Sequence, residues 1–138
     1  MASGTLAEIR SSSPEETEAA GEELAAALRV GDLLLLAGEL GAGKTTFVRG
    51  LARGLGSSGA VQSPTFQLVR VYPGRIQLAH VDLYRLESGA ELADLGLDDL
   101  LEQGIVAVEW GDRLHLDYPR TRRIEFAAPT HEERVIKQ

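Results

Sequence analysis

The sequence predicts an α/β fold with a mainly parallel central sheet flanked by helices and an antiparallel hairpin at one edge. Three patterns indicate this fold. Apolar segments of strand length alternate with segments of helical spacing, as in βαβ units. Residues 33–37 are continuously apolar without alternation, which is typical of a parallel strand covered on both faces. Two strand-like segments joined by Pro73 and Gly74 predict the hairpin.

The N-terminal segment predicts a strand followed by a helix. Residues 5–9 have the composition of a short strand. Ser13, Pro14 and Glu16 then form a helix start, with Ser13 as N-cap and Glu16 as the acid of a capping box. Apolar residues at helical spacing continue this helix to Leu28, and Gly31 ends the unit.

The alternation continues through the rest of the chain. A glycine-rich turn at 38–43 follows the apolar strand and opens into a helix expected from residue 45 to about residue 55. Beyond the Gly-Ser-Ser-Gly segment at 56–59, we expect hairpin strands at 67–72 and 76–82, a helical region from Ser88 to Gln103, and strands at 105–108 and 122–127.

Length and composition favour a single domain over residues 1–138. The chain has 138 residues, 43% of them apolar, and no cysteine, which excludes a disulfide scaffold and a thiolate metal site. No segment approaches the roughly 18 apolar residues of a membrane span, so we expect a cytoplasmic protein without a membrane partner. The net charge of −7 argues against a broad nucleic-acid-binding face.

One motif carries specific chemistry. Residues 38–45, Gly-Glu-Leu-Gly-Ala-Gly-Lys-Thr, match the G-x-x-x-x-G-K-[ST] pattern of a phosphate-binding loop (P-loop) at every position. Its backbone N–H groups and the following helix N-terminus bind phosphate oxygens, Lys44 reaches the β- and γ-phosphates, and the Thr45 hydroxyl can bind Mg²⁺. The nucleotide-binding residues expected here are Leu40, Gly41, Ala42, Gly43, Lys44, Thr45 and Thr46.

A P-loop also requires an acid at the end of a neighbouring strand. Glu109 ends the apolar strand 105–108, and Asp82 ends the strand 76–82. One of them could bind Mg²⁺ while the other orients the attacking water, and the sequence leaves both assignments open. Thr65 lies in a segment where switch-type loops sense the γ-phosphate, although an ordinary turn fits equally well.

The remaining candidate side chains give weaker signals. Trp110 directly follows Glu109, so it is either a core residue or part of the nucleotide pocket. His80, His115 and His131 have no metal-ligand spacing among themselves, and we expect them to be structural or exposed.

Four motifs follow one another along the chain: GELGAGKTTF at 38–47, SPTF at 63–66, HVDLYR at 80–85 and VEW at 108–110. Together they resemble the TsaE (YjeE) family of small P-loop ATPases, which act in making threonylcarbamoyladenosine in tRNA. With the acidic segment around residues 94–98, the resemblance covers about residues 13 to 112. The His-x-Asp-x-Tyr-Arg and Glu-Trp blocks distinguish this family from P-loop proteins at large.

The resemblance implies one P-loop α/β domain that binds ATP with Mg²⁺. Thr45 and Glu109 would hold the metal, Lys44 would bind phosphate, and Asp82 would assist hydrolysis. It also implies that Thr65 lies in the switch-like loop and that Arg134 lies near the nucleotide. An N-terminal residue in the range from Ser13 to Thr17, such as Ser13, would contact the adenine side.

The resemblance further implies that the ATPase acts on two partner proteins, the transferase TsaD and its subunit TsaB. This complex modifies the tRNA adenosine next to the anticodon, and ATP hydrolysis resets it between turnovers. Contact of this chain with tRNA would be only indirect.

Two other functions remain as alternatives. One is a nucleotide-gated interaction module that hardly hydrolyses ATP, which fits the lack of an evident arginine finger in the sequence. The other is a small-molecule P-loop kinase, for which Arg113, Arg120, Arg122 and Arg123 are the only arginine cluster that could form a lid. A regulatory GTPase is disfavoured, because the chain has no Asn-Lys-x-Asp motif.

Overall fold

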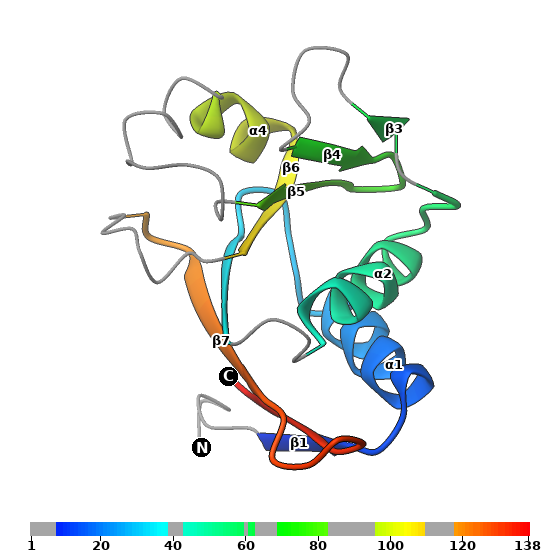
Figure 1. Cartoon of the computed structure of the whole chain (residues 1–138). Helices are drawn as coiled ribbons and strands as arrows, with labels where there is room; N and C mark the ends of the chain where they lie inside the picture. Colours follow the sequence, from blue (N-terminus) through cyan, green and yellow to red (C-terminus); the bar gives the residue numbers. More distant parts are fainter. Residues whose placement is uncertain (1–7, 39–42, 60, 63–68, 83–95, 110–117) are drawn as a thin grey trace.

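An eight-stranded mixed sheet forms the frame of the protein in the computed structural model (Figure 1). The structure describes residues 8–38, 43–59, 61–62, 69–82, 96–109 and 118–138. The strand order is β1-β8-β7-β2-β6-β5-β4-β3. The strands are β1 (Glu8–Ser11), β2 (Leu33–Gly38), β3 (Val61–Gln62), β4 (Val69–Tyr72), β5 (Gln77–Asp82), β6 (Gly104–Glu109), β7 (Thr121–Ala127) and β8 (Arg134–Lys137).

The centre of the sheet is parallel and both of its edges are antiparallel. Strand β2 pairs in parallel with β6 and β7, and β5 pairs in parallel with β6. The predicted hairpin is formed by β4 and β5, but β5 also belongs to the parallel core. At the other edge, β8 pairs antiparallel with β7 and β1. The short strands β3 and β8 were not expected from the sequence, because neither has a pattern long enough to identify it.

The first helix, α1 (Pro14–Ala25), starts where the sequence predicts. The Ser13 hydroxyl accepts a hydrogen bond from the Glu16 N–H at 3.1 Å, and the Glu16 carboxylate accepts one from the Ser12 N–H at 2.8 Å. The capping box is therefore present, with its return bond shifted by one residue. The helix ends before Leu28, which reaches the core from the following turn. The described part of the first strand runs from Glu8 to Ser11, later than the predicted 5–9.

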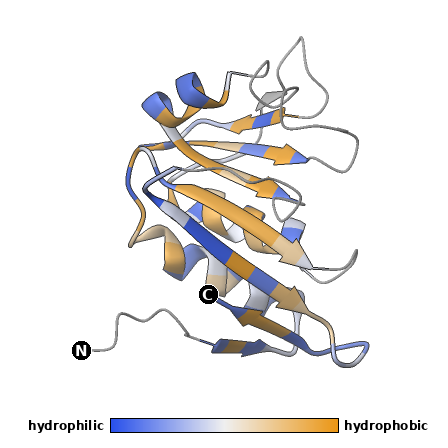
Figure 2. Cartoon of the chain, turned by 90° about the vertical axis from the view of Figure 1, so that its left-hand side faces the viewer, coloured by the Kyte–Doolittle hydropathy of each residue, from blue (hydrophilic) through white to orange (hydrophobic). Residues whose placement is uncertain are grey.

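Helices cover both faces of the parallel strands (Figures 1 and 2). On one face, Leu34 and Leu36 of β2 pack under α1 and α2 (Lys44–Gly54). On the other face, Leu33 and Leu35 belong to a second cluster beneath α4 (Leu97–Gln103). This explains why Figure 2 shows the central strands as almost continuously hydrophobic. The predicted helix start at Ser88 lies outside the described residues.

Helices α1 and α2 approach each other through glycines. A methyl group added at Gly21 of α1 would overlap the carbonyl oxygen of Phe47, and one added at Gly50 of α2 would overlap that of Glu18. The two helices run side by side (Figure 1), and the Thr17 methyl carbon lies 3.4 Å from the position of a Cβ on Gly43. This packing holds the first turn of α1 against the start of α2. Within the described residues, no helix is long and apolar enough to cross a membrane.

The close approach of the two helices gives a stability prediction. We expect Gly50→Ala to lower the free energy of unfolding by about 1–3 kcal/mol, because the added methyl group overlaps backbone of α1. Alanine otherwise favours a helix over glycine by about 1 kcal/mol, so the packing effect must exceed this gain. Denaturant unfolding measures the difference. Gly59→Ala is the control, since a Cβ there meets nothing within 4 Å. A Gly50→Ala chain as stable as the parent would contradict the described helix contact.

Candidate nucleotide-binding site

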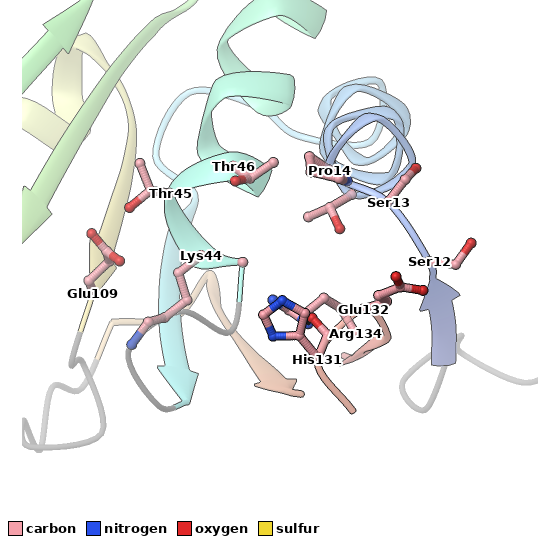
Figure 3. A pocket seen from close by; sticks show the side chains of 12 residues that line it. Ser12, Ser13, Pro14, Lys44, Thr45, Thr46, Glu109, His131, Glu132 and Arg134 are labelled. Atoms are coloured by element: carbon pink, nitrogen blue, oxygen red, sulfur yellow. The ribbon is translucent and has the colours of Figure 1, made fainter. Parts of the chain in front are cut away.

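A cavity of about 560 Å³ opens at the carboxyl ends of the parallel strands (Figure 3). Its walls come from the start of α1, the start of α2, the end of β6 and the connection between β7 and β8. This volume lies within the usual range for small-molecule sites. The described residues that line it are Ser12, Ser13, Pro14, Thr17, Gly43, Lys44, Thr45, Thr46, Glu109, His131, Glu132 and Arg134.

Helix α2 presents its N-terminus to the cavity. Gly43 is the N-cap, and its φ of 101° lies in the left-handed region that favours glycine. Among the residues that the structure describes, no side chain makes a capping hydrogen bond at this end. The backbone N–H groups of the first turn therefore provide donors and a positive partial charge at the cavity, which suits an anionic ligand.

The Lys44 side chain lies deep at the same end of the cavity. It is only 4% exposed, and its ammonium Nζ donates a hydrogen bond to the Gly38 carbonyl oxygen at 2.6 Å. Gly38 is the last residue of β2, so this bond connects the start of α2 to the end of the strand that precedes the loop. The ammonium thus lies where a P-loop lysine is expected.

Glu109 brings a carboxylate to the cavity from the last position of β6. It pairs in register with Leu36 of β2, two residues before the loop begins. In Figure 3 the Thr45 hydroxyl is directed toward the Glu109 side chain. Hydroxyl and carboxylate oxygens are ligands that Mg²⁺ prefers, so the donor chemistry of this pair fits that cation.

A histidine on the adjacent strand β5 is within hydrogen-bond distance of the Glu109 carboxylate. His80 Nε2 lies 2.8 Å from Glu109 Oε2, and both residues are buried. The sequence predicts a structural or exposed role for His80, and no spacing in it connects His80 with Glu109. The available signal was the strand alternation, which places His80 on the same face as Asp82 and therefore near the acid that ends β6.

Asp82 ends β5 in register with Glu109. It is half-buried and does not line the cavity formed by the described residues, whereas Glu109 does. The two candidate acids thus lie on adjacent strands, with Glu109 on the cavity wall beside Thr45.

The start of α1 forms the opposite wall of the cavity. The Ser11 and Thr17 hydroxyl oxygens lie 2.7 Å apart and are buried, and Ser11 also donates to the Ser13 carbonyl oxygen at 2.8 Å. These bonds fix the first turn of α1 against the end of β1. Ser13 and Pro14 consequently line the cavity on the side away from Glu109 (Figure 3).

Arg134 organises the connection between β7 and β8. Its guanidinium Nη1 donates to the carbonyl oxygens of His131 at 3.1 Å and Glu133 at 2.9 Å, and more weakly to that of Thr130 at 3.4 Å. This places His131 and Glu132 on the cavity wall (Figure 3). Glu132 is not among the site residues predicted from the sequence, because no motif surrounds it. His131, predicted to be structural or exposed, is exposed.

The structure brings together seven of the predicted site residues, which come from four separate segments. They are Ser13, Gly43, Lys44, Thr45, Thr46, Glu109 and Arg134. The predicted residues Leu40, Gly41, Ala42, Thr65 and Trp110 lie outside the described residues.

Comparisons with known proteins agree with the motifs. The family described as "Threonylcarbamoyl adenosine biosynthesis protein TsaE" matches residues 11–136. The tRNA threonylcarbamoyladenosine biosynthesis protein TsaE of Streptomyces coelicolor is 54% identical over 96 residues, covering 67% of this chain and 65% of that protein. The protein of the same name from Bacillus subtilis is 45% identical over 115 residues, covering 82% of this chain and 72% of that protein.

The same similarity extends to a solved structure. A crystal structure of Bacillus subtilis YdiB superposes with a TM-score of 0.75 at 36% sequence identity, covering 96% of this chain and 83% of that one. The chain matches slightly less than two thirds of the length of the Streptomyces coelicolor relative. The family match spans nearly all of the described sheet and every described residue of the cavity wall. The chain therefore belongs to the TsaE family.

Proposed function

We propose that this chain is the ATP-binding and ATP-hydrolysing subunit needed to make threonylcarbamoyladenosine in tRNA, and that residues 1–138 form one domain. One observation carries the proposal. A single cavity brings together the Lys44 ammonium, the Thr45 hydroxyl and the Glu109 carboxylate at the N-terminus of α2. A cation, a metal-binding hydroxyl and an acid at a helix N-terminus are the parts that phosphoryl transfer requires.

In this proposal, the phosphates of ATP bind at the start of α2. Lys44 would exchange its hydrogen bond to the Gly38 carbonyl oxygen for contacts with the β- and γ-phosphates. The backbone of residues 40–43 and Thr46 would bind the rest of the phosphate chain. Because Lys44 is buried, its charge acts in a medium of low dielectric constant and interacts strongly with phosphate. These groups stabilise the charge that develops during hydrolysis.

Thr45 and Glu109 are the proposed protein ligands of Mg²⁺, which neutralises charge on the phosphates when bound. Glu109 is favoured over Asp82 because Glu109 is the one that lines the cavity beside Thr45. Asp82, on the adjacent strand, is proposed to orient the attacking water, with Thr65 in the switch-like loop. The nucleoside end of ATP would then lie toward Ser13 and Arg134, and Trp110, which directly follows Glu109, is proposed to line the nucleotide pocket.

The names of the relatives support the proposed pathway, because they are tRNA threonylcarbamoyladenosine biosynthesis proteins. The partners TsaD and TsaB are proposed from the resemblance to the TsaE family. The net charge of −7 favours protein partners over direct binding of tRNA. We therefore propose a cytoplasmic protein that acts on the TsaD–TsaB complex and contacts tRNA only indirectly.

A nucleotide-gated interaction module is the second candidate, and the arrangement of Arg134 favours it over a fast enzyme. Arg134 is the only arginine among the described residues that line the cavity, and its Nη1 binds carbonyl oxygens of its own loop. An arginine that stabilises the transition state can accelerate hydrolysis about 10³–10⁵-fold, so its engagement elsewhere fits slow turnover by the chain alone.

Hydrolysis assays test the proposal directly. We expect slow Mg-ATP hydrolysis by the chain alone and faster hydrolysis with purified TsaD–TsaB. Lys44→Ala should reduce turnover about 100-fold or more, because the main cation at the phosphates is lost. Lys137→Ala is the matched control, since this second lysine is exposed on β8 and pairs with Glu8 at 3.7 Å. Turnover that is equal with and without the partners, or absent in both cases, would favour the interaction module.

A carboxylate variant tests the metal site. We expect Glu109→Gln to lose about 100-fold or more in Mg²⁺-dependent hydrolysis, because the neutral amide is a poor ligand for a hard cation. Repeated rounds of tRNA modification with TsaD–TsaB should then stop, as measured by modified tRNA formed per chain. Glu102→Gln on the exposed face of α4 is the matched control. A Glu109→Gln chain that still supports many rounds of modification would rule out the metal-ligand role.

A further inference from the structure

A buried hydrogen bond connects β5 to the acid of the cavity wall. His80 Nε2 lies 2.8 Å from Glu109 Oε2, and the two residues are 6% and 8% exposed. Figure 3 shows Glu109 on the same side of the cavity as Thr45. His80 itself does not line the cavity. Any effect of His80 on a ligand in the cavity would therefore pass through Glu109.

The sheet register produces this contact. His80 pairs with Ala107 and Asp82 pairs with Glu109 in the parallel β5–β6 ladder. Side chains of registered residues project from the same face of a sheet, so His80 and Glu109 are diagonal neighbours on the face covered by α2. Ala107, between them on that face, is small and leaves room for the imidazole to reach the carboxylate.

The buried position of His80 would reduce the stability of the fold without its hydrogen bond to Glu109. His80 lies between Ala79 and Val81, which are both 0% exposed, in a strand whose other core positions are apolar. Burial of an imidazole without a hydrogen-bond partner costs free energy, and an apolar side chain would avoid that cost. The bond to Glu109 offsets it. His80 is thus a polar residue at a core position whose hydrogen bond goes to an acid of the cavity wall, which indicates a role in that site.

Donor chemistry defines what the histidine does. A carboxylate in the form that binds a metal only accepts hydrogen bonds, so this role of Glu109 assigns the proton of the bond to His80 Nε2. The bond engages Oε2 and removes rotational freedom from the end of the Glu109 side chain. Oε1 and the remaining lone pair of Oε2 can then face Thr45. Carboxylates that bind metals are commonly oriented in this way by a second hydrogen-bonding residue.

We propose that His80 is a positioning residue, whose Nε2–H holds the Glu109 carboxylate in the orientation that binds the metal of the metal–nucleotide complex together with Thr45. This inference rests on the proposed role of Glu109. It assigns to the first residue of the His-x-Asp segment a function distinct from that of Asp82, which ends the same strand.

Two substitutions of His80 separate the effect of its hydrogen-bond donor from the effect of its volume in the core. His80→Leu keeps a side chain of similar size but has no donor, whereas the amide nitrogen of His80→Gln extends about as far from the backbone as imidazole Nε2. Affinity for ADP is measured by calorimetry in EDTA, and affinity of the ADP-bound chain for Mn²⁺ by electron paramagnetic resonance. We expect His80→Leu to keep its ADP affinity in EDTA and to bind Mn²⁺ about 10- to 100-fold more weakly, while His80→Gln stays close to the parent chain.

A second measurement needs no ligand. Nitrogen-15 NMR of the parent chain without nucleotide or metal is expected to show His80 protonated at Nε2, with that proton protected from exchange. Unchanged Mn²⁺ affinity in His80→Leu, an equal loss in His80→Gln, or an unprotonated Nε2 would each overturn the positioning role. Failure of the proposed function is distinguishable, because the parent chain itself would then bind neither ADP nor Mn²⁺ with ADP.

Discussion

The parallel pairing of β2 with β6 is the constraint on which the rest of the site depends. It sets Glu109 beside Leu36, two residues before the point where the chain leaves the sheet at Gly38. Parallel strands end at the same edge, so the acid of one strand and the helix start that follows the other must converge there. The pairing in turn requires apolar side chains on both faces, which α1, α2 and α4 cover.

A second constraint comes from the contact between α1 and α2. Glycines at the crossing allow the backbone of one helix to lie directly against that of the other. The first turn of α1 is therefore held close to the start of α2. The hydroxyl contact between Ser11 and Thr17 fixes that turn to the outer strands as well. The cavity thus has one wall from the parallel core and another from α1 and the β7–β8 connection. The segments that form these two walls are far apart in the sequence.

Buried polar groups are concentrated where these walls meet. Lys44 of α2, His80 of β5 and Glu109 of β6 are all less than a tenth exposed, beside a core that is mainly leucine, isoleucine, valine and alanine. Each has a hydrogen-bond partner, Gly38 for the lysine and one another for the histidine and the glutamate. Outside the site, the buried Asp32 shows the same rule, since it binds the Arg120 guanidinium at 2.6 Å and raises the pKa of that group. Such groups reduce stability unless paired, and their pairing keeps the site rigid.

The sequence by itself determined the features that depend on neighbours along the chain. The strand at 33–37, the helix starting near Lys44, the capping of α1 by Ser13 and the glycine at position 43 follow from local periodicity, side-chain capping and backbone geometry. Only the tertiary structure decided that Glu109 rather than Asp82 lines the described cavity, that His80 contacts Glu109, and that Glu132 lies on the cavity wall. It also revealed β8, whose four residues become a strand through pairing with β1 and β7. These outcomes depend on strand register and loop packing between residues far apart in sequence, and no local pattern encodes those contacts.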